Sequence, residues 1–283
     1  MSVVAYSDIA KKPNDLLNRD FFHLAPASLD VKTKADNGVT FTARGKSSPK
    51  DGSISGALEA KYTDAKSNIA LTQSWSTNNT IDTKFELPPY IPNLKTDVAT
   101  SFVPSSGATG AKLNLTYKQP LFMSRAFVDL LKGPTFTTDF SFGKAGIVAG
   151  GEVAYDVPGG RVTNYAAGIG YGAGNFAVAL TAAKKLSIIS AAYYTKPTPA
   201  VEVGAKATLD SKSTAQVALE VGAKYTIDST SSAKVKISNT GLVSLSYLQS
   251  LTKGVKVGFG AAVDTQRLAE PAHKLGFSFS FEA

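Results

Sequence analysis

Apolar and polar residues alternate with a period of two along almost the whole chain. The clearest run lies near the end, where apolar residues of one parity are separated by polar or small ones: Leu275, Phe277, Phe279 and Phe281. Residues 243–247 and 255–263 repeat this pattern, and turn pairs such as Asp51-Gly52 separate such runs. Because successive side chains of a strand point to opposite faces, the alternation predicts strands with one apolar and one wetted face. The spacing predicts about 17–20 strands after residue 25.

The first residues break this pattern. Between Tyr6 and Phe22 the apolar residues fall at helical spacings, with charged residues between them. We therefore predict an amphipathic helical segment, which Pro13 interrupts because proline lacks a backbone donor and clashes with the preceding turn.

The composition includes few of the residue types that commonly act in catalysis. The 283 residues include no cysteine and only two histidines, His23 and His273. Thiolate metal sites, disulfides and thiol nucleophiles are therefore absent, and we expect no catalytic residues, no metal and no cofactor. The spacing of Gly168, Gly170 and Ala173 resembles a dinucleotide loop, but it lies in a strand-like run with no helix after it. The net charge of +8 points to an anionic partner, and we expect that partner not to be nucleic acid.

Two architectures could hold this many strands. A soluble sandwich packs its apolar faces together, whereas a membrane barrel turns them toward lipid and its polar faces toward a water-filled lumen. Lysine recurs on the polar parity, and tyrosines stand near the ends of many runs, where the membrane interfaces would lie. Both features favour the barrel. No apolar run is suited to a transmembrane helix, because the longest uncharged one, 162–183, holds four glycines and alternates like a strand.

Several fragments, in their order and spacing, resemble one family. They are Asn14-Asp-Leu-Leu-Asn-Arg-Asp-Phe-Phe22, Leu71-Thr-Gln-Ser-Trp75, Gly241-Leu-Val-Ser-Leu-Ser-Tyr247 and His273-Lys-Leu-Gly-Phe277. The whole chain resembles the mitochondrial porins, or voltage-dependent anion channels, in a fungal form. The resemblance implies an all-β membrane protein: a 19-stranded transmembrane β-barrel (25–283) in the mitochondrial outer membrane, closed by a parallel pairing of its first and last strands, with an amphipathic helical segment (1–24) inside the pore. It also implies a voltage-gated, weakly anion-selective channel that passes ATP, ADP, other metabolites and small ions.

This reading assigns roles to individual residues. We expect the pore to be lined by basic side chains that favour anions through a screened field: Lys12, Lys61, Lys84, Lys112, Lys206, Lys234, Lys236 and Lys256. The nucleotide contacts that the resemblance implies fall on Lys11, Arg19, Leu242, Val243, Ser244, Gly260, Ala261, Ala262, Val263 and Asp264.

The last strand resembles the sorting signal of mitochondrial barrels, with its polar, glycine and apolar positions at Lys274, Gly276, Phe279 and Phe281. Expected partners are therefore membrane lipids, the anionic permeants, the outer-membrane sorting and import machinery, and further copies of the chain in a homo-oligomer. Two alternatives remain at this stage: a related protein-import barrel and a soluble all-β binding protein.

Overall fold

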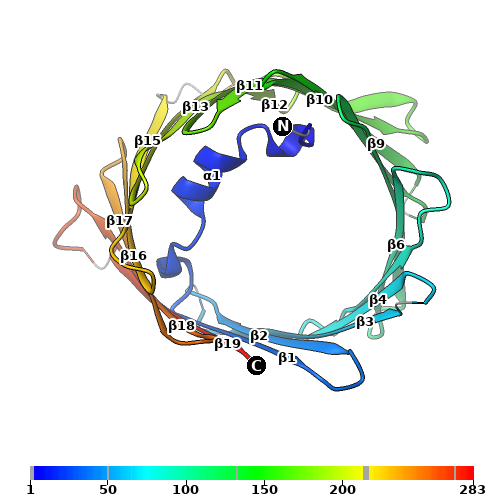
Figure 1. Ribbon diagram of the computed structural model, residues 1–283, viewed down its shortest axis with the longest axis horizontal. Coiled ribbons are helices and arrows are strands. Elements are labelled where there is room, and N and C mark those ends of the chain that lie inside the picture. Colours follow the sequence, from blue (N-terminus) through cyan, green and yellow to red (C-terminus); the bar gives the residue numbers. More distant parts are fainter. Residues whose placement is uncertain (1–2, 50, 65, 132, 213–216, 271) are drawn as a thin grey trace.

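The computed structural model describes residues 3–49, 51–64, 66–131, 133–212, 217–270 and 272–283. Within them one 19-stranded sheet closes into a barrel (Figure 1). Its strands are β1 (Ala27–Lys34), β2 (Thr40–Ser47), β3 (Ile54–Asp64), β4 (Ile69–Ser76), β5 (Ile81–Leu87), β6 (Leu94–Val103), β7 (Ala108–Lys118), β8 (Phe122–Asp129), β9 (Thr135–Lys144), β10 (Ile147–Asp156), β11 (Arg161–Ala173), β12 (Phe176–Ala183), β13 (Ile188–Thr198), β14 (Val201–Asp210), β15 (Ala218–Thr226), β16 (Ser231–Ser238), β17 (Leu242–Thr252), β18 (Val255–Asp264) and β19 (Lys274–Glu282).

The barrel closes through a parallel pair. Strand β1 lies antiparallel to β2 on one side and parallel to β19 on the other, with Ala27 opposite Phe277 and Val31 opposite Phe281. All the other neighbouring strands are antiparallel. Closure pairs every strand on both sides, so the sheet presents no free edge. The predicted 19-stranded barrel is thus confirmed.

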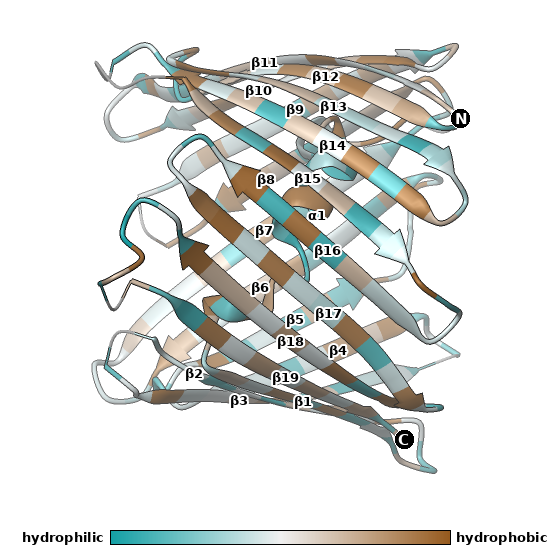
Figure 2. Cartoon of the chain, turned by 90° about the vertical axis from the view of Figure 1, so that its left-hand side faces the viewer, coloured by the Kyte–Doolittle hydropathy of each residue, from teal (hydrophilic) through white to brown (hydrophobic). Residues whose placement is uncertain are grey.

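The apolar parity faces outward. Large apolar side chains such as Leu275 and Phe277 are 68% and 45% exposed on the outer surface, and Phe259 on β18 packs edge-on against Phe277. Figure 2 shows the alternation of brown and teal segments along single strands. In a soluble sandwich these side chains would be buried between sheets, so their exposure excludes that alternative. None of the helices in the described ranges is long and apolar enough to cross a membrane.

The N-terminal segment lies inside the barrel along part of its wall (Figure 1). It consists of η1 (Tyr6–Asp8), α1 (Lys11–Asn18) and η2 (Phe22–Leu24). Two leucines of α1 fill spaces on the wall that glycines leave open: a Cβ at Gly204 would stand 2.8 Å from Leu16, and one at Gly222 would stand 2.8 Å from Leu17. Leu17 is fully buried. Apolar packing on glycine therefore holds the helix to β14 and β15.

The predicted interruption of the helix exists, but its predicted position is wrong. Pro13 lies in the first turn of α1, and the break falls earlier, between η1 and α1. Amides of the first turn have no partner within a helix, so the missing N–H of Pro13 removes no helical bond. The first such bond comes from the amide of Asn14, which donates to the carbonyl of Ala10 at 3.1 Å.

Candidate functional site

Three predicted lysines form a row on the inner wall. Strand register places Lys61 opposite Thr72, Thr72 opposite Lys84, Lys84 opposite Ala99, and Ala99 opposite Lys112. The lysine row, defined as Lys61, Lys84 and Lys112, therefore crosses β3–β7 with a lysine on every second strand. The row lies on the face that carries the N-terminal segment. Lys112 is opposite Asp129 of β8. Arg125, four residues before Asp129 and therefore on the same face of β8, contacts Ser7 of the segment.

The members of the row differ in their neighbours. Lys84 is paired with two carboxylates, those of Glu86 at 3.1 Å and Asp97 at 3.7 Å. Among the residues that the structure describes, neither Lys61 nor Lys112 forms an ion pair. Mobile ions in the lumen screen these two charges, and that screening sets the reach of their field to about 10 Å at 0.1 M salt.

A second group of charges surrounds a cavity of about 270 Å³ beside α1. Four cations and three carboxylates line it: Lys12, Arg19, Lys224 and Lys234, with Asp15, Asp20 and Glu202. The side chain of Lys12 lies over the ring of Tyr194, with Nζ 5.9 Å from the ring centroid. The cavity is polar, open to the lumen and cationic on balance, which suits a transient contact with phosphate groups.

Wall residues that were predicted to line the pore also hold the helix. Lys234 donates from Nζ to the carbonyl of Arg19 at 3.0 Å and lies 3.3 Å from Asp20. Lys206 donates to the side-chain oxygen of Asn14 at 3.0 Å. These lysines therefore contribute both charge to the lumen and contacts to the segment.

Lys236 and Lys256 complete the predicted set. Lys236 is paired with Glu220 at 3.1 Å and lies 5.5 Å from the centroid of the Phe21 ring. Lys256 lies near the start of β18, on the parity of Gly258 and Gly260, which face the N-terminal segment. Both therefore lie on the lumen face.

The two strand stretches implied for nucleotide contact are neighbours. Leu242 lies opposite Asp264, Val243 opposite Val263, and Ser244 opposite Ala262 in the β17–β18 pair. Alternation places Leu242, Ser244, Gly260, Ala262 and Asp264 on the lumen parity, and Val243, Ala261 and Val263 on the outward one. The structure therefore brings only every second residue of these stretches to the lumen.

Two of the lumen-facing residues, Gly260 and Asp264, already contact other parts of the protein. Gly260 lies under Phe22 and His23, and Asp264 is paired with Arg267 at 2.9 Å. Lys11 is separated from Arg19: it is paired with Asp8 at 3.7 Å and lies outside the polar cavity that Arg19 lines. The structure brings together Lys12, Arg19 and Lys234 instead.

The four residues of the predicted sorting signal divide between two faces of β19. Phe279 and Phe281 lie opposite Leu29 and Val31 of β1 and point outward. Gly276 faces the lumen, where an added Cβ would overlap the carbonyl oxygens of Phe22 and Ala25. Lys274 shares the parity of Gly276.

Sequence reasoning missed one charged group that the structure buries. Asp139 on β9 is 1% exposed and accepts hydrogen bonds from Arg125 on β8. Arg125 also donates to the hydroxyl of Ser7 at 3.1 Å. In the sequence both residues are ordinary charged residues of the polar parity, so no local signal marks them.

A closed barrel with an apolar outer face and a charged, partly open interior is a membrane-spanning pore. Comparison with known families agrees, because residues 2–276 match the eukaryotic porin family. The chain belongs to the eukaryotic porin family. Members of this family are channels rather than enzymes, and the protein is a β-barrel of the mitochondrial outer membrane.

Similar proteins match along the full chain. A mitochondrial outer membrane protein porin of Candida albicans is 49% identical over 284 residues and covers 100% of both chains. One of Neurospora crassa is 46% identical, also with full coverage of both. The non-selective voltage-gated ion channel 1 of Saccharomyces cerevisiae is 40% identical over 285 residues, again covering 100% of both. These relatives favour a porin over the protein-import alternative.

Proposed function

We propose that this porin conducts small anions and anionic metabolites, ATP and ADP among them, with a weak preference over cations and with voltage-dependent closure. The lysine row carries the anion preference, because Lys61 and Lys112 present charges that no described carboxylate pairs. Ions keep their water in so wide a lumen, so the preference arises from a screened field and not from dehydration. The relative of Saccharomyces cerevisiae is named non-selective, which is consistent with a preference that is small.

Nucleotides would make their closest contact at the polar cavity beside α1. Lys12, Arg19, Lys224 and Lys234 supply cations there, while Asp15, Asp20 and Glu202 limit the net attraction. Such a balance favours brief contact over retention, as a conducting pore requires. The lysine row and this cavity lie on different parts of the wall. We therefore expect a permeating phosphate group to contact each of them separately.

The test of the anion preference is a planar-bilayer recording across a KCl gradient. We expect a reversal potential with the sign of the chloride equilibrium potential. Its magnitude should fall when the salt concentrations of both solutions are raised together. A reversal potential with the sign of the potassium equilibrium potential, or one that does not depend on salt concentration, would overturn the proposed role of the lysines. Voltage steps in the same recording test closure, which should appear as a fall in current after the step. A current that stays steady at both polarities would contradict it.

Nucleotide passage needs its own measurement. Liposomes loaded with ATP and containing the wild-type channel should release it faster than liposomes containing the Arg19→Glu variant, with equal release of an uncharged sugar. The uncharged sugar controls for pore size. Slower release of both ATP and the sugar would show a blocked pore rather than a lost phosphate contact.

The remaining partners follow from the fold. Membrane lipids contact the apolar outer face. For biogenesis we propose that β19 is the strand read by the sorting machinery, since Phe279 and Phe281 point outward and the backbone of β19 has no partner on one side until the barrel closes on β1. We further propose that copies of the chain associate through the outer face. Crosslinking in native membranes tests that association, and recovery of monomer alone would contradict it.

A further inference from the structure

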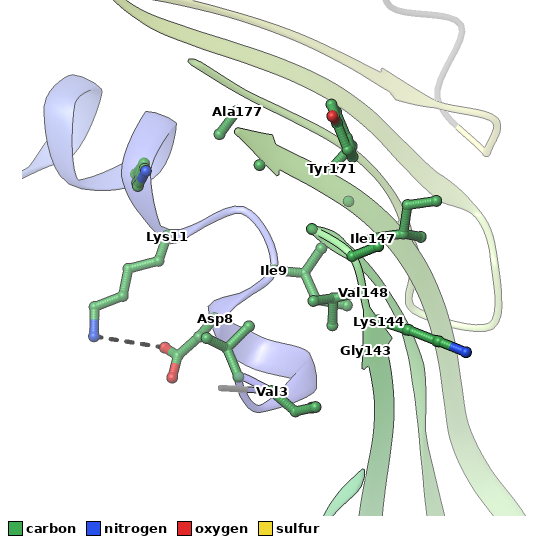
Figure 3. A pocket seen from close by; sticks show the side chains of 16 residues that line it. Val3, Asp8, Ile9, Lys11, Gly143, Lys144, Ile147, Val148, Tyr171 and Ala177 are labelled. Carbon is green, nitrogen blue, oxygen red and sulfur yellow. Dashed lines mark ion pairs between the residues drawn. The ribbon is translucent and has the colours of Figure 1, made fainter. Parts of the chain in front are cut away.

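An apolar cavity of about 290 Å³ lies between the N-terminal segment and the wall of β9–β12 (Figure 3). Val3 and Ile9 of the segment and Val148 of β10 contribute side chains to it, and glycine backbones line much of the rest. The volume is close to the lower end of the range of about 300–1,000 Å³ that small-molecule sites occupy. The cavity is separate from the lysine row.

Glycines of the wall create this space. A Cβ at Gly143 would stand 3.0 Å from Val3, and one at Gly170 would stand 2.8 Å from Ile9, so the segment fills these two positions. Gly172 is two residues beyond Gly170 on the same face of β11, and nothing lies within 4 Å of the place a Cβ would take. The space beside Gly172 is therefore open.

One end of the cavity is cationic. Lys11 and Lys12 of the segment lie there, a third lining lysine, Lys144, lies on the side of the wall (Figure 3), and Asp8 is the single carboxylate among the described lining residues. Asp8 is paired with Lys11 at 3.7 Å (dashed in Figure 3), but both side chains are well exposed, so the pair is weak. Lys12 forms no ion pair with a described residue. The cavity thus combines an apolar interior with a lining whose charge is positive on balance.

We propose that this cavity binds a linear amphiphile with an anionic head, of the class of medium-chain fatty acids. The carboxylate would lie at Lys11 and Lys12, and the alkyl chain would pack on Ile9, Val148 and the open face of Gly172. Charge complementarity favours this ligand over a neutral or cationic chain. Because the ligand would contact both the segment and the wall, its binding would hold the start of the segment in place.

The test uses the full chain in zwitterionic micelles, with ¹³C-labelled isoleucine and valine methyl groups and octanoate as the probe. We expect saturable NMR shifts of the Ile9 and Val148 methyl groups with octanoate, and none with octanol or acetate at equal concentration. Equal shifts with octanol would overturn the anionic requirement. The absence of any saturable shift with octanoate would overturn the site itself.

Two variants locate the binding. Gly172→Leu fills the cavity and should abolish the shifts, whereas Gly45→Leu, at another position with nothing within 4 Å, should keep them. The double variant Lys11→Gln/Lys12→Gln should weaken octanoate binding at least tenfold. If Gly172→Leu does not fold, this double variant still tests whether octanoate binds in the cavity. Wild-type affinity in either folded cavity variant would contradict the proposal.

Discussion

Arg125 on β8 donates a hydrogen bond of 3.1 Å from Nη2 to the hydroxyl of Ser7, 118 positions earlier in the chain. The same guanidinium donates from Nε to the carboxylate of Asp139 at 2.9 Å. Ser141, two residues beyond Asp139 on β9, donates to the carbonyl of Val4 at 2.6 Å. These contacts fasten the start of the N-terminal segment to β8 and β9, while Phe22 and Ala25 hold its other end at β19.

Removing the Ser7 hydroxyl should loosen the start of the segment. The lost bond is to a charged group but is open to lumen water, so Ser7→Ala should cost docking about 1 kcal/mol. Hydrogen exchange of the amides of η1 should accelerate about fivefold. Ser74→Ala, at a lumen-facing serine whose hydroxyl has no hydrogen bond to a described residue, is the control and should leave their exchange unchanged.

The middle of the segment depends on Leu17. Its side chain is completely buried against Gly222, so Leu17→Ala should destabilise docking by about 2–5 kcal/mol. Exchange of the α1 amides measures this loss. Leu24→Ala is the matched control, because Leu24 is 58% exposed. A loss in Leu17→Ala no larger than in Leu24→Ala would show that the packing on glycine does not hold the helix.

The parts of this fold that depend on local pattern could be predicted, and those that depend on distant pairing could not. Alternation alone predicts the strands and the lumen parity of the lysines, since it needs only the period of a strand. The number 19 and the parallel pairing of β1 with β19 came from the family resemblance. Nothing local distinguishes a first strand that pairs with the last from one that stays at an edge.

The candidate site shows the same limit. Stretches 242–244 and 260–264 were assigned as blocks, but a strand presents only alternate residues to the lumen, so Val243 and its outward neighbours do not reach it. Asp139 was missed because burial of a charge depends on a partner, Arg125, that lies on another strand. The position of the helix break likewise depends on where α1 begins, since Pro13 is harmless in a first turn.

Gly276 should be required in the folded barrel as well as in sorting. An added Cβ there would overlap the carbonyl oxygens of Phe22 and Ala25, so Gly276→Ala should lower the stability of protein refolded from urea into micelles. Refolding involves no sorting machinery, so a lower melting temperature isolates the structural effect. Gly45→Ala, whose Cβ meets nothing within 4 Å, should melt like the wild type.

Acid should weaken the attachment of η2. Burial, and then the positive charges of Lys236 and Lys274, lower the pKa of His23 from its ordinary value of 6.5. The undocked segment therefore binds more protons, so docking is at full strength above pH 6.5 and weakens as the pH falls below it.

Hydrogen exchange of the η2 amides, corrected for its intrinsic pH dependence, follows this loss. His23→Gln should remove the dependence below pH 6.5, and His273→Gln, on the exposed loop before β19, should retain it. An unchanged profile in His23→Gln would assign the acid sensitivity to other groups.

The most direct test of the account is the reversal potential of the Lys61→Glu/Lys112→Glu channel across a KCl gradient at low ionic strength. Reversing these two charges, neither of which is paired with a described carboxylate, should move the potential from the value expected for chloride selectivity toward that for potassium selectivity, and added salt should reduce the shift. Lys253→Glu, in the β17–β18 turn outside the row, changes charge without changing the inner wall and should leave the potential near that of the wild type. A double variant that keeps the wild-type reversal potential would contradict the lysine row as the source of anion preference.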